Sequence, residues 1–127
     1  MSTAFPEFDG AGTQLGGSII HMSLDDWGRM GRLLVDGKGA GGAQVVAPDW
    51  LAFLKTPAPT NPRYGGHVWL SQNGLVSMRG HIGQFVFAGA RNGHSVVLVR
   101  LGNTREDLLD KIVPTYERIA EAALPRG

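Results

Sequence analysis

The stretch that decides the fold is QFVFAGARNGHSVVLVRL, residues 84–101. Two segments rich in Val and Phe, 84–90 and 94–101, flank the tripeptide Arg91-Asn92-Gly93. Asn-Gly supplies the two positive φ angles that a two-residue hairpin turn requires. The stretch therefore predicts an antiparallel β-hairpin.

Two further extended segments precede this hairpin. Residues 76–79 form a short extended segment, and we expect them to lead into the first strand of the hairpin. The side chains of residues 66–71 are expected to alternate between two faces. His67, Trp69 and Ser71 lie on one face, and the apolar Val68 and Leu70 lie on the other. This alternation is typical of a strand with one buried face. Together the segments predict an antiparallel meander of about three strands.

The N-terminal half contains two helical segments. Ser23 is suited to cap the first helix, Asp26 completes a capping box, and Asp36-Gly37 ends it. The apolar residues of this helix recur at spacings of three and four: Leu24, Trp27, Met30, Gly31 and Leu34. Pro48 is expected to be the first residue of a second helix, 48–54, with Trp50, Leu51 and Leu54 directed inward.

A longer helix is predicted at the C-terminus. Thr104 is its expected cap, with Asp107 as the capping-box partner, and Pro114 is expected to kink or split it. Its apolar stripe consists of Leu108, Leu109, Ile112, Val113, Tyr116, Ile119 and Ala123. With the sheet, these helices predict a single α+β domain over residues 1–127, in which the C-terminal helix covers one face of the sheet.

Composition excludes several classes of function. The 127 residues carry a net charge of only +1, with 12 basic and 11 acidic residues scattered along the chain, so we expect no nucleic-acid binding. There is no cysteine for a disulfide or a thiolate metal site. No apolar run is long enough to cross a membrane. The N-terminus lacks the features of a signal peptide, so a cytoplasmic location is the default expectation.

The polar residues do not form a familiar metal, phosphate or nucleophile motif. The four histidines, His21, His67, His81 and His94, lack metal-ligand spacing, so neither a metal nor a cofactor is expected. The glycine-rich segment 37–42 contains Lys38 without a following Ser or Thr, which favours a surface loop over a phosphate site. None of the six serines has Lys three residues later. A scattered catalytic triad based on another histidine stays open.

The most suggestive cluster is Arg79-Gly80-His81-Ile82-Gly83-Gln84, which runs directly into the strand that begins the hairpin. Glycines beside a polar residue at a strand edge let a ligand approach backbone amides. Such amides can stabilise an oxyanion, and a histidine can transfer a proton. The alternative is a β-bulge with a hydrogen-bonded structural histidine. Composition alone favours the alternative.

Five segments in order resemble the β-lactamase-related serine hydrolases, the family of class C β-lactamases, penicillin-binding esterases and 6-aminohexanoate-dimer hydrolases. They are residues 17–34 (Gly17-Ser18 through Ser23 to Leu34), Val45-Val46-Ala47-Pro48-Asp49-Trp50, Tyr64-Gly65-Gly66-His67-Val68-Trp69-Leu70, residues 80–87 and residues 96–102. Each motif is weak by itself, but five in register cover nearly the whole chain. The resemblance implies the C-terminal part of the β-lactamase/transpeptidase-like fold.

The resemblance also implies roles for the glycine-flanked cluster. In the family, the first residue of a His-x-Gly or Lys-Thr-Gly triplet interacts with the catalytic tyrosine or the substrate, and the amide after the triplet supplies half of the oxyanion hole. By this resemblance His81 takes the first role and the backbone amide of Gln84 the second. Gly80, Ile82 and Gly83 are implied to contact the substrate, with Gly83 permitting its close approach.

One departure from the family is large. The family's Ser-x-x-Lys nucleophile and Tyr-x-Asn-type base have no counterpart in the sequence given. We therefore expect a truncated hydrolase region that is inactive alone and would act on a small ester, amide or β-lactam only when complemented. The alternative is a non-catalytic binding or self-association module. Its exposed sheet edge, residues 96–101, would pair with a second copy or with a separate N-terminal hydrolase chain.

Overall fold

The computed structural model describes residues 3–15 and 19–126. The Gly17-Ser18 portion of the first family-like segment lies outside the described residues. Along the chain the elements are β1 (Phe5–Pro6), β2 (Ile20–His21), α1 (Leu24–Asp36), α2 (Pro48–Leu54), β3 (Trp69–Leu70), β4 (Val76–Gly80), a 3₁₀ turn (His81–Gly83), β5 (Gln84–Arg91), β6 (His94–Arg100) and α3 (Glu106–Ala122).

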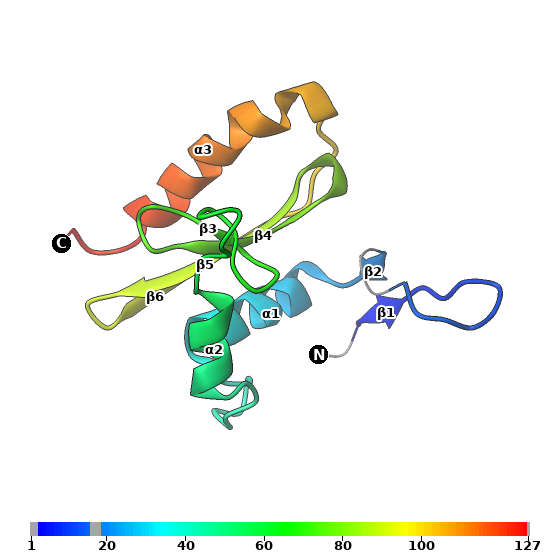
Figure 1. Ribbon diagram of the computed structural model, residues 1–127, viewed down its shortest axis with the longest axis horizontal. Helices are drawn as coiled ribbons and strands as arrows, with labels where there is room; N and C mark the ends of the chain where they lie inside the picture. The colour runs from blue at the N-terminus through cyan, green and yellow to red at the C-terminus, as the bar shows by residue number, and fades with distance from the viewer. Residues whose placement is uncertain (1–2, 16–18, 127) are drawn as a thin grey trace.

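The centre of the molecule is an antiparallel sheet in the order β3-β4-β5-β6 (Figure 1). The predicted hairpin is confirmed, with Arg91 opposite His94 and Phe85 opposite Arg100. Asn92 and Gly93 have φ values of 51° and 78°, the two positive angles of a type I′ turn. This turn sets the register of the two longest strands, and the register in turn decides which side chains face each side of the sheet.

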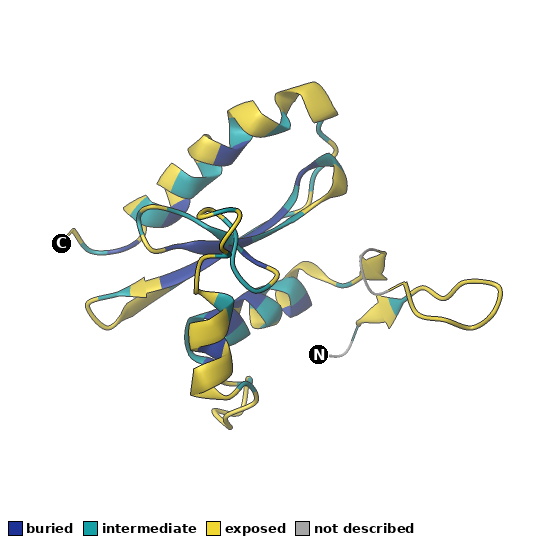
Figure 2. Ribbon diagram, in the orientation of Figure 1, coloured by how far each residue is buried: buried dark blue, intermediate teal, exposed yellow. Residues whose placement is uncertain are grey.

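Helices cover both faces of the sheet, with α3 on one side and α1 on the other (Figure 1). Between the sheet and α3 lies one apolar cluster: Leu75, Phe85, Phe87, Val113, Ala120 and Leu124. The opposite face carries a second cluster: Leu34, Val68, Val76 and Ala88. The buried residues accordingly gather along β4 and β5 in Figure 2. The α+β class and the C-terminal helix on one face are confirmed. The helix α1 was also predicted, but its position on the opposite face of the sheet was not.

Helix α1 approaches the sheet through a glycine. A Cβ atom on Gly31 would lie 2.4 Å from Cγ1 of Val97 and 2.8 Å from Cγ1 of Val86. Both distances are shorter than van der Waals contact, so no larger residue fits without displacing a strand side chain. By contrast, Gly28, one turn earlier in the same helix, has no atom within 4 Å of the corresponding position. Gly31 therefore sets the distance between helix and sheet.

The N-terminal segment contains the small antiparallel pair β1–β2, and it extends away from the sheet in Figure 1. Its link to the body is Asp26, which is fully buried. The Asp26 carboxylate accepts hydrogen bonds from the backbone N–H and the hydroxyl of Thr3, at 2.9 and 2.6 Å. Ser23 caps α1 as predicted, because its hydroxyl accepts from the N–H of Asp26.

Other local expectations need correction. Segment 76–80 is a full strand, whereas 66–71 shortens to β3, because His67 takes a φ of 66° that no strand accommodates. Thr104 does not cap α3: the helix begins after Arg105 without a side-chain cap, and the Thr104 hydroxyl accepts from Arg100 instead. Pro114 lies within α3 without splitting it. In α2, Leu51 is buried but Trp50 is exposed and stacks on Phe53.

A polar network joins β4 to α3 at the edge of the first cluster. The Arg79 guanidinium donates to the Glu117 carboxylate at 2.9 Å and to the buried Ser77 hydroxyl at 3.0 Å. Ser71 also donates to Glu117, at 2.7 Å. Burial lowers the pKa of Arg79 from its ordinary value, and the negative charge of Glu117 opposes that shift. The Glu117 carboxylate therefore stabilises the charged form of Arg79, which burial by itself disfavours.

Candidate functional site

The glycine-flanked cluster, residues 79–84, forms a tight connection between β4 and β5. Gly80 pairs with Gln84, and His81, Ile82 and Gly83 form the 3₁₀ turn between them. Ile82 has φ 51° and ψ 23°, in the left-handed region that β-branched residues rarely adopt. Gly83, at φ 88°, follows it. A β-branched residue held there is local strain, and such strain gathers at functional sites.

The His81 side chain projects into solvent. It is 76% exposed, and its Nδ1 atom lies 3.4 Å from Oε1 of Glu106, the first residue of α3. The alternative of a structural histidine in a β-bulge is therefore not what the structure contains. An ion pair this exposed adds little stability. It does place a carboxylate near Nδ1, so Nε2 is the ring nitrogen farther from that carboxylate.

The carbonyl side of the turn is bound to the segment that follows β6. The Ile82 carbonyl accepts from the N–H of Thr104 at 2.8 Å, and the Gly83 carbonyl accepts from Nη1 of Arg100. The side-chain amide of Gln84 makes two further bonds to the backbone of Gly102, one as donor and one as acceptor. Four hydrogen bonds thus join the turn to residues 100–104.

Arg100 is the residue of this site that sequence reasoning missed. Its guanidinium also donates to the Tyr116 hydroxyl at 3.0 Å and the Thr104 hydroxyl at 2.6 Å. A Cβ atom on Gly83 or Gly102 would lie 2.3 or 2.2 Å from its Nη1 atom. Both glycines therefore leave the space that the guanidinium occupies. The signal was an arginine ending an apolar strand, but no local rule pairs it with a turn 17 positions away.

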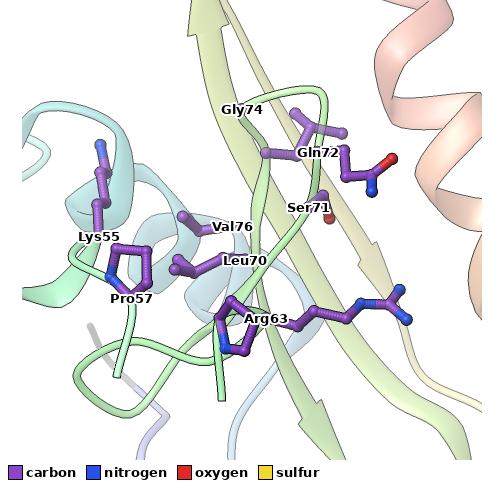
Figure 3. A pocket seen from close by; sticks show the side chains of 10 residues that line it. Lys55, Pro57, Arg63, Leu70, Ser71, Gln72, Gly74 and Val76 are labelled. Carbon is purple, nitrogen blue, oxygen red and sulfur yellow. The ribbon is translucent and has the colours of Figure 1, made fainter. Parts of the chain in front are cut away.

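A hollow lies elsewhere, between β3, the start of β4 and the loop after α2 (Figure 3). It has a volume of about 460 Å³, with Leu70 and Val76 at its centre and Lys55 at one edge. Val76 is at the opposite end of β4 from Gly80, about 13 Å away at the usual rise of a strand. A second hollow, at the end of α3, includes Arg91 and Arg118. Neither is lined by residues of the 80–84 turn.

The remaining polar candidates are not gathered at the turn. His21 pairs with Glu7 in the N-terminal segment, and His94 is an exposed residue at the far end of the β5–β6 hairpin. The Ser71 hydroxyl donates a hydrogen bond to Glu117, and the Ser77 hydroxyl accepts one from Arg79. Within residues 3–15 and 19–126, no group of three or more His, Cys, Asp or Glu side chains could hold a metal ion.

No family model matches the chain, and the search of curated proteins found no match either. Among the residues that the structure describes, no helix is long and apolar enough to cross a membrane.

Proposed function

We propose that this chain forms one wall of a serine hydrolase active site, for which another polypeptide segment supplies the nucleophile and base. His81 and the backbone amide of Gln84 are its catalytic groups, and Gly80, Ile82 and Gly83 contact the substrate. The class of substrate is a small ester, amide or β-lactam. The observation that carries the proposal is an exposed imidazole on a strained turn whose carbonyl side is bound to residues 100–104.

The chemistry assigns one task to each group. A serine of the complementary segment attacks the substrate carbonyl, and its base takes the hydroxyl proton. The carbonyl oxygen becomes an oxyanion, which the N–H of Gln84 stabilises. Nε2 of His81 hydrogen-bonds to the substrate or the catalytic base, on the side of the ring away from the Glu106 carboxylate. Without the attacking serine this wall has no reaction to accelerate.

Complementation tests this proposal. The purified chain is assayed with nitrocefin and p-nitrophenyl acetate, alone and after mixing with a separately expressed N-terminal segment of a β-lactamase-family hydrolase that contains Ser-x-x-Lys. We expect turnover only in the mixture. His81→Ala should lower kcat by about 10²-fold or more, the usual contribution of a proton-transfer group. His94→Ala, at an exposed histidine remote from the turn, is the matched control and should change nothing.

Two results would contradict the proposal. One is hydrolysis by the chain alone that depends on His81, since the proposal places the nucleophile outside the chain. The other is a mixture in which His81→Ala is as active as the unsubstituted chain.

A second candidate function is strand addition at β6 by another copy of the chain. Among the described residues, β6 pairs only with β5 and forms the outer edge of the sheet. Because Arg91 and His94 close a two-residue turn, the backbone groups of Ser95, Val97 and Val99 point to the open side. No proline or lysine lies within His94–Arg100 to discourage pairing. Sedimentation velocity decides it: a monomer at high concentration would contradict self-association.

A further inference from the structure

We infer that Asn92 is a modification site: in the folded protein its side-chain amide is lost to give aspartate or isoaspartate, whereas the amide of Asn73 is protected. This chemistry is independent of the hydrolase function proposed above. Of the four asparagines in the sequence, Asn73 and Asn92 are the two that are followed by glycine. Because glycine has no Cβ, the peptide nitrogen after each of them is equally unobstructed in the unfolded chain. The fold makes the two sites different.

The reaction requires only the chain and water. The N–H of Gly93 gives its proton to a solvent base, and its nitrogen attacks the side-chain carbonyl carbon of Asn92. The new C–N bond closes a succinimide ring, and the amide nitrogen takes a proton and leaves as ammonia. Water then opens the ring. Opening at the side-chain carbonyl gives aspartate, and opening at the main-chain carbonyl gives isoaspartate, whose backbone passes through the former side chain.

The groups that react at Asn92 are free. Asn92 and Gly93 are exposed residues of the turn between β5 and β6, and a Cβ atom on Gly93 would have no other atom within 4 Å. Within residues 3–15 and 19–126, no hydrogen bond engages the Asn92 side chain or the Gly93 N–H. Attack also requires rotation about the Asn92 Cα–C bond. An exposed hairpin tip permits this rotation by local opening, at a small part of the cost of global unfolding.

The corresponding groups at Asn73 are all engaged. Nδ2 of Asn73 donates to the Glu121 carboxylate at 3.1 Å, and Oδ1 accepts from the N–H of Leu75 at 3.2 Å. The attacking nitrogen here belongs to Gly74, and its N–H donates to the Ser71 carbonyl at 3.2 Å. Three hydrogen bonds must therefore break before this nitrogen can reach the side-chain carbonyl carbon.

The two products affect the hairpin differently. Aspartate, like asparagine, tolerates the positive φ angles of a type I′ turn, so it adds a negative charge and leaves the strands in register. Isoaspartate adds a carbon to the backbone within a turn of two residues. The strands then cannot keep the pairing of Arg91 with His94 that closes this turn. Formation of isoaspartate therefore weakens the β5–β6 hairpin at its closed end.

Peptide mapping by mass spectrometry tests this inference on the full chain. Trypsin cleaves after Arg79 and Arg91, so the two asparagines fall in different peptides. The chain is incubated at mildly alkaline pH, folded or unfolded in guanidinium chloride. In the folded chain we expect Asn92 to lose its amide about 30-fold faster than Asn73, a ratio equivalent to about two hydrogen bonds. In guanidinium chloride the two rates should be similar.

Two variants test the physical reasons. Glu121→Ala removes one hydrogen bond of Asn73, so it should speed the loss of that amide about fivefold and leave the rate at Asn92 unchanged. Asn92→Asp carries the charge without the extra backbone carbon, so it should unfold at the same urea concentration as the original chain. The isoaspartate fraction, separated by ion exchange and reversed-phase chromatography, should unfold at a lower concentration.

Three results would contradict the inference. Equal rates of amide loss at Asn73 and Asn92 in the folded chain would show that the hydrogen bonds give no protection. An Asn92 amide that persists in the folded chain, while guanidinium chloride exposes both sites to loss, would show that the turn itself blocks the reaction. An isoaspartate fraction as stable as Asn92→Asp would overturn the effect on the hairpin.

Discussion

The contact between α1 and the sheet yields a sharp prediction from two glycines of one helix. Replacing a helical glycine by alanine ordinarily stabilises a protein by about 1 kcal/mol. Gly28→Ala should show this gain, because its Cβ would meet nothing within 4 Å. Gly31→Ala has the same propensity gain, but its Cβ would overlap two valine methyl groups, at 2.4 and 2.8 Å.

The two valines have little room to yield. A β-branched side chain is stiff at χ1, so Val97 and Val86 cannot simply rotate away. Overpacking of a core costs about 1–3 kcal/mol, and two overlaps below 3 Å place this site near the upper limit. Set against the propensity gain of about 1 kcal/mol, Gly31→Ala should destabilise the fold by about 2 kcal/mol. The two variants should therefore differ by about 3 kcal/mol.

Urea and thermal unfolding measure this difference. At about 4 °C per kcal/mol for a domain of this size, Tm should rise by about 4 °C in Gly28→Ala and fall by about 8 °C in Gly31→Ala. Adding Val97→Ala to the Gly31→Ala background should show a favourable coupling of at least about 1 kcal/mol in a double-mutant cycle. If Gly31→Ala stabilises as much as Gly28→Ala does, α1 does not pack on the sheet at this position.

Three further predictions concern charges and the open edge. Glu117→Gln should lower the free energy of unfolding by about 2 kcal/mol, because it leaves the partly buried Arg79 cation without its carboxylate. Urea titration at neutral pH measures this loss, and an unchanged unfolding midpoint would contradict it. The Arg32 side chain, and then the N–H of Lys38, lower the pKa of Asp36. The stability that this shift provides is present above the unfolded pKa and lost as pH falls through the lower folded pKa, so Arg32→Gln should raise the pKa of Asp36 in an NMR titration and weaken the acid dependence of unfolding. Ser95→Pro removes an N–H that points to the open side of β6, so it should abolish any dimer seen by sedimentation, whereas Ser95→Ala should not; a dimer that survives the proline was not formed through this edge.

The local elements follow from short-range patterns. Ser23 before an apolar helical repeat predicted the start of α1, and Asn92-Gly93 between apolar segments predicted the β5–β6 hairpin, because a cap or a tight turn needs only the residues next to it. Where a tertiary contact competed, local prediction was wrong. Thr104 has the side chain of a helix cap, yet its hydroxyl is bonded to Arg100.

Local patterns therefore predicted the α+β class, the register of the hairpin and a glycine-flanked His81 just before β5. Three features appeared only once the chain was folded: α1 covers the second face of the sheet through Gly31, His81 is exposed beside Glu106, and Arg100 is bonded to the Gly83 carbonyl. The difference is one of range along the chain. Caps and turns are settled by neighbours within four residues, whereas a guanidinium finds its carbonyl only after β5, β6 and α3 have packed together.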